Sequence, residues 1–209
     1  MEPVEQIIEV QSVLDRLTRF RHLNGWAAVV AGILSLIAYA ALGIFYDTPW
    51  LVDHADPNAI VTSASVWQFI VAIVALFVIA AVVCGSIILM SLPKDLTKYA
   101  WRNLLRLIGT YALYILTGGF IAFNLLFQAT EPTMGILQFI PPLMCMMYGL
   151  AQFHASHVSL PSLKFLGVWI LLCGIIGMLV PSLGWFFWMV GFGPGHILMG
   201  IYVLIRSGN

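Results

Sequence analysis

Six long apolar stretches divide the chain, and each is long enough to cross a membrane as a helix. About 20 mainly apolar residues are needed, because the hydrocarbon layer is ~30 Å thick and a helix rises ~1.5 Å per residue. The six stretches are 25–46, 66–91, 105–127, 133–153, 163–180 and 183–205. They predict an all-α, polytopic transmembrane helical bundle of six spans that occupies residues 25–209.

The first 24 residues follow a different pattern, that of an amphipathic helix. Apolar residues recur three and four positions apart, which is the spacing of one helix face, and these residues are Ile7, Val10, Leu14 and Leu17. Arg16, Arg19 and Arg21 follow close to the first span. Residues 1–24 therefore form either an interfacial helix on anionic lipid headgroups or a cytoplasmic docking surface for a partner protein.

The basic residues give the orientation, because short basic segments stay on the cytoplasmic side. The connections 47–65, 128–132 and 181–182 contain no Lys or Arg. All nine basic residues lie toward the other side: Arg16, Arg19, Arg21, Lys94, Lys98, Arg102, Arg106, Lys164 and Arg206. This split predicts an N-in/C-in, multi-pass protein of the inner (cytoplasmic) membrane.

Composition excludes two classes of protein. Of the 209 residues, 61% are hydrophobic and 9% charged, whereas an ordinary soluble domain has about 25% charged residues. The formal net charge of zero argues against direct binding of nucleic acid. Membrane lipids are the partners that this composition predicts.

His196 is the ionisable residue that falls at mid-depth in a predicted span, directly after Gly193, Pro194 and Gly195. Pro194 removes a helix donor, so we expect a kink or break there. A loosened turn beside an imidazole is suited to binding a polar headgroup, a metal or a substrate. In the alternative interpretation, neutral His196 bonds to a neighbouring helix and locks the bundle.

A second interruption is expected at Pro141 and Pro142, with Gln138 one turn before them. Asn124 approaches the outer end of the span 105–127. Together with His196 these residues predict an outward-facing polar cavity, because discontinuous helices are tolerated where they line one. In the alternative interpretation each side-chain amide forms a hydrogen bond between helices.

His154 and His157 lie three residues apart and follow Cys145 on the same span, which makes them a candidate site for Cu(I) or zinc. The sequence has neither a Cys-x-x-Cys nor a His-Glu-x-x-His motif. Haem would need two histidines at similar depth, and His196 alone is central. No catalytic residues and no particular cofactor are predicted.

Three groups of residues carry a family resemblance. They are Leu17-Thr18-Arg19-Phe20 through Ala31-Gly32-Ile33, Tyr148-Gly149-Leu150-Ala151 through Leu166-Gly167, and Pro181 to Trp188 followed by Gly191-Phe192-Gly193 and His196 to Tyr202. In these stretches the chain resembles a family of small, largely uncharacterised bacterial six-span integral membrane proteins. The resemblance implies a bacterial inner membrane. Such proteins often accompany a winged-helix transcription regulator, which implies a regulatory role.

These observations together predict a non-enzymatic membrane sensor or regulatory protein that binds a small apolar or lipidic ligand. A transport facilitator or substrate-binding transport subunit is one alternative. A haem- or metal-bearing redox protein is another. We also expect homo-oligomers, through the small residues Gly118, Gly119, Gly191 and Gly195.

Overall fold

The computed structural model describes residues 25–45, 63–90, 98–128, 134–157 and 159–207. The described elements are all helical: α2 (Gly25–Phe45), α3 (Ser63–Met90), α4 (Lys98–Gln128), α5 (Met134–Ala155), α6 (Leu163–Leu179), the short 3₁₀ turn η2 (Pro181–Leu183) and α7 (Gly184–Ser207). Each of the six predicted stretches coincides with one α-helix, and the largest difference is the earlier start of α4. The amphipathic helix predicted over 1–24 lies outside the described residues.

Three of these helices contain a stretch long and apolar enough to cross a membrane. The stretches are Trp101–Leu126, Ile136–Ala155 and Pro181–Arg206. The apolar parts of the other three helices, as far as they are described, are shorter. The all-α architecture is thus confirmed.

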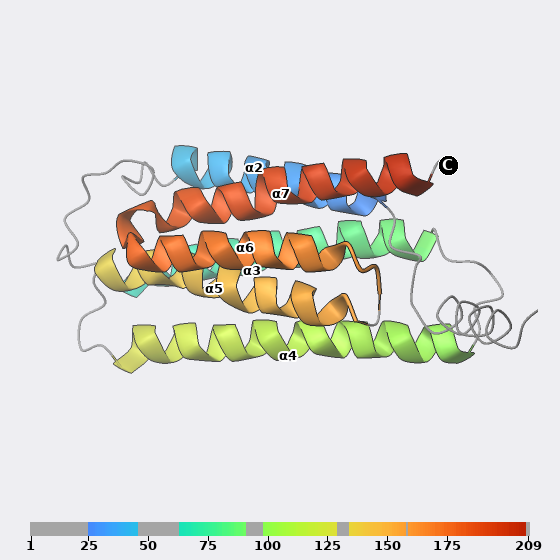
Figure 1. The fold of residues 1–209 in the computed structure, drawn as a ribbon. Coiled ribbons are helices and arrows are strands. Elements are labelled where there is room, and N and C mark those ends of the chain that lie inside the picture. The colour runs from blue at the N-terminus through green and yellow to red at the C-terminus, as the bar shows by residue number, and fades with distance from the viewer. Residues whose placement is uncertain (1–24, 46–62, 91–97, 129–133, 158, 208–209) are drawn as a thin grey trace, which may run out of the picture.

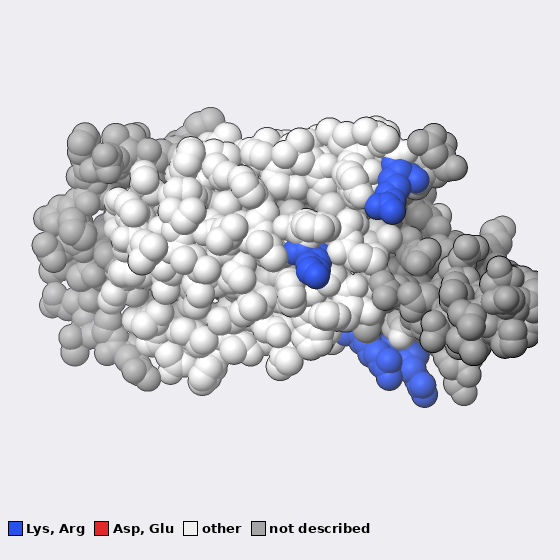
Figure 2. Space-filling view, in the orientation of Figure 1, with Lys and Arg blue, Asp and Glu red and all other residues white. Residues whose placement is uncertain are grey.

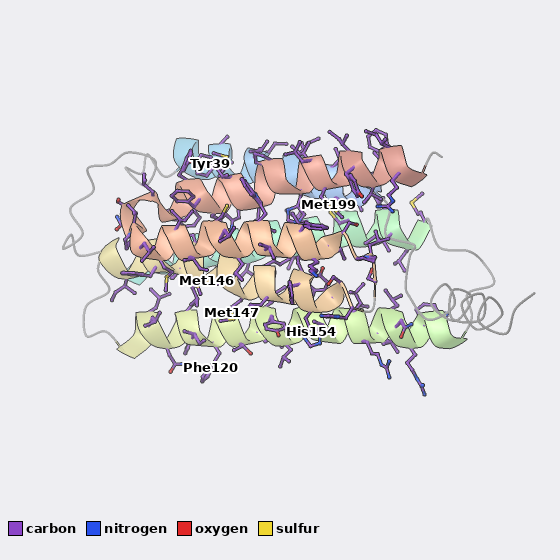
Figure 3. The ribbon with its side chains drawn as sticks, in the orientation of Figure 1. Tyr39, Phe120, Met146, Met147, His154 and Met199 are labelled. Carbon is purple, nitrogen blue, oxygen red and sulfur yellow. The ribbon has the colours of Figure 1, made fainter. Side chains whose placement is uncertain are left out.

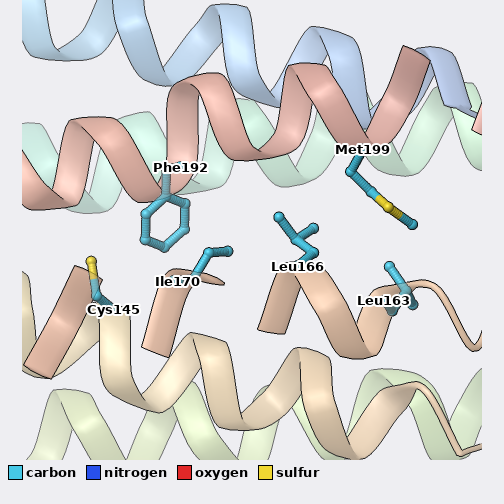
Figure 4. Close-up of a cluster of buried hydrophobic side chains, with 6 residues drawn as sticks. All are labelled: Cys145, Leu163, Leu166, Ile170, Phe192 and Met199. Carbon is cyan, nitrogen blue, oxygen red and sulfur yellow. The ribbon is translucent and has the colours of Figure 1, made fainter. Parts of the chain in front are cut away.

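The helices lie side by side in the order α4, α5, α6, α7 and α2, with α3 against α2 (Figure 1). Helices α5, α6 and α7 enclose the main core (Figure 4). That core consists of Cys145, Leu163, Leu166, Ile170, Phe192 and Met199. A smaller cluster of Leu104, Leu107 and Ala155 joins α4 to α5.

Glycines bring α2 and α7 into backbone contact. A Cβ atom at Gly25 would lie 2.6 Å from the Gly200 carbonyl oxygen, and one at Gly32 would lie 2.6 Å from the Gly193 carbonyl oxygen. The two glycines on each helix are separated by seven residues, so the contact repeats after two turns. We call this set of four glycines the α2–α7 seam.

Helices α5 and α6 meet in the same way. Cβ atoms at Gly149 and Gly167 would each lie 2.8 Å from the other residue's carbonyl oxygen, and one at Gly174 would lie 2.9 Å from that of Pro142. The spacing is again seven residues on each helix. Small residues at this spacing allow membrane helices to approach closely, which maximises van der Waals contact.

Three of the four glycines predicted to join copies of the chain face a helix of the same chain. A Cβ atom would meet Met147 at Gly118, Cys173 at Gly191 and Trp169 at Gly195. Gly119 has open space around it. Self-association stays a prediction, and Gly119 is the position of the four that is free for it.

The outer surface of the described helices is mainly apolar. Phe120 is 69% exposed and points away from the bundle on α4 (Figure 3). The basic side chains gather toward one end of the bundle (Figure 2). Arg102 and Arg106 lie near the start of α4, Lys164 lies in the first turn of α6, and Arg206 lies in the last turn of α7.

Candidate functional site

A cavity of about 310 Å³ lies between α2, α3, α5 and α7, and Ile115 of α4 also lines it. Its walls are mainly aliphatic and aromatic. Tyr148 and His196 contribute polar groups near one end of the cavity. Trp185, which lies eleven residues before His196 on α7, also lines it. An apolar cavity with a few placed polar groups is the usual form of a small-molecule site.

His196 projects from α7 and is 4% exposed. Its Nδ1 lies 2.8 Å from the carbonyl oxygen of Phe192, one turn earlier. A carbonyl can only accept, so Nδ1 carries a proton and donates it to this bond. The Nε2 atom lies 3.1 Å from the hydroxyl of Tyr148 on α5.

The hydroxyl of Tyr148 belongs to a longer series of bonds. The Gln152 side-chain nitrogen donates to the Tyr148 oxygen over 2.8 Å, and the Tyr111 hydroxyl donates to Gln152 Oε1 over 2.6 Å. Tyr148 then donates to His196 Nε2, which accepts only when the imidazole is neutral. Both hydroxyls and the protonated ring nitrogen thereby have an acceptor. We call Tyr111, Gln152, Tyr148 and His196 the Tyr148–His196 network.

Aromatic packing fixes the rings of this network. The Phe192 ring is stacked on the His196 imidazole, with centroids 5.6 Å apart and planes 14° apart. The Tyr148 ring lies 4.8 Å from the Phe192 ring and 5.6 Å from the His196 ring, so the three rings contact one another. Trp188, which lines the cavity, contacts Phe192 at 5.4 Å. The network and the cavity wall are therefore one packed unit.

Of the kink or break predicted at Pro194, the break is wrong, because α7 is continuous from Gly184 to Ser207. The missing proline N–H leaves the carbonyl of Val190 without its helical donor. Trp169 on α6 supplies a replacement, with Nε1 3.4 Å from that carbonyl oxygen. Gly195 makes room for the indole, since a Cβ there would lie 2.8 Å from it.

Gly193 also has a packing role. A Cβ atom there would lie 2.5 Å from Leu36, a residue of α2. Gly193 and Gly195 thus bring α7 close to its neighbours. Neither glycine lines the cavity.

The interruption predicted at Pro141 and Pro142 is also wrong, because α5 is continuous from Met134 to Ala155. Pro141 lines the cavity, whereas Pro142 is fully buried against α6. Pro142 has no N–H, so the Gln138 carbonyl lacks its helical donor. A Cβ atom at Gly184 would lie only 2.6 Å from this carbonyl oxygen. Gly184 thus allows the start of α7 to approach this carbonyl closely.

The polar cavity predicted from these residues is corrected accordingly. His196 and Pro141 line the observed cavity, while Asn124 and Gln138 lie outside its lining. The Asn124 side chain donates to the Phe120 carbonyl of its own helix over 2.8 Å. The cavity is mainly apolar, and His196 shares its lining with three polar side chains that were not predicted, those of Ser35, Cys84 and Tyr148.

The residues of the candidate metal site are not brought together. His154 and His157 lie edge to face, with ring centroids 6.4 Å apart, and Cys145 is buried in the core of Figure 4. Nine residues of helix, or about 14 Å, separate Cys145 from His154. Within the described residues, no group of three His, Cys, Asp or Glu side chains is placed to hold a metal ion.

Haem ligation by His196 would also need a rearrangement. Both ring nitrogens are already bonded, one to the Phe192 carbonyl and one to the Tyr148 hydroxyl. An axial ligand needs a ring nitrogen with a free lone pair. His196 meets this requirement only if Tyr148 moves away.

Sequence reasoning missed several residues of the site. Ser35 on α2 is a cavity-lining residue with 9% of its surface exposed, and its hydroxyl has no hydrogen-bond partner among the described residues. Its position in the middle of a predicted span was the available signal. Tyr148 and Gln152 were detectable as polar side chains four residues apart, on one helix face. Their link to His196 depends on the tertiary fold.

No protein-family model, curated protein or solved structure matches this chain. The resemblance described from its sequence stays a prediction.

Proposed function

We propose that this protein is a non-enzymatic membrane sensor or regulatory protein that binds a small apolar or lipidic ligand within the bilayer. The observation that supports this most directly is the cavity of about 310 Å³ between α2, α3, α5 and α7. Apolar walls favour an apolar molecule, and the polar groups at one end orient it.

The position of the cavity favours access from the lipid. Ile37 on α2 and Ile79 on α3 both line it, and they are 57% and 52% exposed. The cavity therefore reaches the apolar outer surface between these two helices. None of the buried core residues belongs to the described part of α3.

The Tyr148–His196 network supplies a route from ligand to protein. It joins α4, α5 and α7 through Tyr111, Tyr148 and His196, and two of these residues line the cavity. A ligand that displaces the Tyr148 hydroxyl changes the contacts of all three helices. We propose that a partner protein at the N-terminal helix reads this change.

We further propose that all six helices cross the cytoplasmic membrane, with both termini inside. Two observations support this topology. The outer surface is apolar along the bundle, and the described basic side chains gather at one end (Figure 2). Basic residues at one membrane face are typical of the cytoplasmic side.

The test is native mass spectrometry of the purified protein, with an absorption spectrum and elemental analysis of the same sample. We expect one stoichiometric apolar molecule. Ala80→Phe should remove most of the bound mass, because Ala80 lines the cavity. Val82→Phe is the matched control, since Val82 is 61% exposed and lies outside the lining.

Other outcomes favour other functions. A ligand-free mass for the unmodified protein, or equal retention by the two variants, would contradict the proposal. Stoichiometric colour or metal would favour a redox protein. Uptake of a solute into proteoliposomes would favour a transport facilitator.

A further inference from the structure

Most polar groups at one end of the cavity already have partners. The Cys84 thiol donates to the Ala27 carbonyl over 3.5 Å, and both ring nitrogens of His196 are bonded. The proton of the Tyr148 hydroxyl is used in the bond to His196. The Ser35 hydroxyl differs, because it is buried and unpaired among the described residues. A buried hydroxyl without a partner is costly, and Ser35 belongs to the lining of the cavity, so a rotation about its Cα–Cβ bond can bring the enclosed hydroxyl to a ligand group.

Tyr148 also keeps part of its bonding capacity. A phenol oxygen has two lone pairs, and Gln152 uses one of them. The second is left for a donor. Ser35 thus offers a donor and an acceptor to the cavity, and Tyr148 offers one further acceptor.

These two groups lie at nearly the same height in the bundle. The α2–α7 seam places Gly32 opposite Gly193, and Ser35 follows Gly32 by less than one turn. Tyr148 contacts the rings of Phe192 and His196, which flank Gly193 on α7. Ser35 and Tyr148 therefore lie within about one turn of each other along the bundle axis.

The lining of the cavity has no charged partner for an ionised ligand. Among the described residues, the lining contains no Lys, Arg, Asp or Glu, and its histidine is in the neutral form that its hydrogen bonds require. Transfer of a carboxylate or ammonium group into such surroundings is unfavourable. The polar group of the ligand is therefore neutral.

We propose that the cavity binds a neutral, single-chain lipid alcohol, whose hydroxyl lies between Ser35 and Tyr148 and whose chain extends toward Trp185. A hydroxyl can accept from Ser35 and donate to Tyr148, whereas a ketone or ether can only accept. This inference rests on the proposed function, because it specifies the ligand of the same cavity.

The dimensions of the cavity set the length of the chain. From Tyr148 to Ile140, which both line it, α5 rises about 12 Å over eight residues. A volume of about 310 Å³ holds roughly ten groups of ~30 Å³ each, the volume of a water molecule in the liquid. Decanol is a probe of this size.

The experiment measures binding to the full chain in detergent by tryptophan quenching. The probes are decanol, decane and decanoate, each brominated at the far end of the chain, where Trp185 and Trp188 line the cavity. Ser35→Ala removes the unpaired hydroxyl with little change in volume. Comparison of each variant with wild type for the same probe cancels the partition of that probe into micelles.

We expect Ser35→Ala to weaken decanol binding about tenfold, the effect of one well-formed hydrogen bond, and to leave decane binding unchanged. Tyr148→Phe should weaken decanol binding in the same direction. Ser86→Ala is the matched control, because Ser86 on α3 is exposed and already donates to the Val82 carbonyl over 2.7 Å. Decanoate should give no saturable quenching.

Several results would overturn the inference. Saturable decanoate binding that Ser35→Ala weakens would show that the site accepts an anion. If Ser35→Ala bound both decanol and decane as tightly as wild type does, the cavity would be purely apolar, and the proposed function would stand. Failure of all three probes to quench, in a protein that also carries no bound lipid, would remove the proposed function itself.

Discussion

The hydroxyl of Tyr148 holds the Tyr148–His196 network together, because it is both donor and acceptor. Its removal takes away the acceptor of Gln152 Nε2 and the donor to His196 Nε2. Each unpaired buried group costs about 1–3 kcal/mol, and some relaxation is available. We expect Tyr148→Phe to lower the free energy of unfolding by about 2 kcal/mol, measured by thermal unfolding in detergent.

Tyr114→Phe is the control for this change. The Tyr114 hydroxyl lies 3.4 Å from His154 Nδ1 in an exposed position, so its loss should cost less than about 0.5 kcal/mol. Equal losses from the two substitutions would contradict the network as a stabilising unit. They would leave His196 as a histidine held by packing alone.

At the scale of helices, the glycine contacts distinguish α2 and α7 from an ordinary apolar pair. A methyl group at Gly32 would overlap the carbonyl oxygen of Gly193 and approach the Ile197 backbone nitrogen to 3.0 Å. Backbone atoms cannot turn aside as a side chain can, so the two helices must separate. We expect Gly32→Ala to lower the free energy of unfolding by at least ~2 kcal/mol.

The matched control for this prediction is Gly85→Ala on α3. No atom lies within 4 Å of a Cβ placed at Gly85, and alanine is the better helix former by up to about 1 kcal/mol. Gly85→Ala should therefore leave the melting temperature unchanged or raise it. A similar loss for both variants would mean that the α2–α7 seam is not a close contact.

The helices also show where sequence reasoning succeeds and where it ends. Hydropathy locates all six helices, because each needs an apolar surface along its whole length. The breaks predicted at Pro141 and Pro194 are wrong because the compensating groups come from other helices, such as the indole of Trp169. The sequence likewise does not show that Gly32 lies opposite Gly193, because this contact forms only when α2 and α7 pack together.

The candidate site likewise contains one residue that the sequence identifies and others that only the fold reveals. His196 is visible in the sequence, because an ionisable residue within an apolar stretch is unusual. Ser35 and Tyr148 resemble the common small and aromatic residues of membrane helices. They stand out only when the fold brings them to the same cavity.

At the scale of the whole molecule, the number of membrane crossings depends on the shorter helices. Helix α6 has 17 residues and spans about 26 Å, a few ångströms less than the hydrocarbon layer. A mismatch of this size costs only fractions of a kcal/mol per Å, and Lys164 at its first turn can extend its charge to the headgroups. Since α6 packs between α5 and α7, we expect it to cross where they cross.

The distribution of basic residues then predicts the position of each connection. All nine Lys and Arg residues belong to one side, so 47–65 should be external, and 92–97 and the C-terminus cytoplasmic. Alkaline phosphatase, which folds only outside, should be active when fused within 47–65 and inactive within 92–97 or at the C-terminus. Green fluorescent protein should give the reverse pattern, which controls for expression. An active phosphatase at the C-terminus would require an odd number of crossings or an external N-terminus, and the six-span, N-in arrangement would then be wrong.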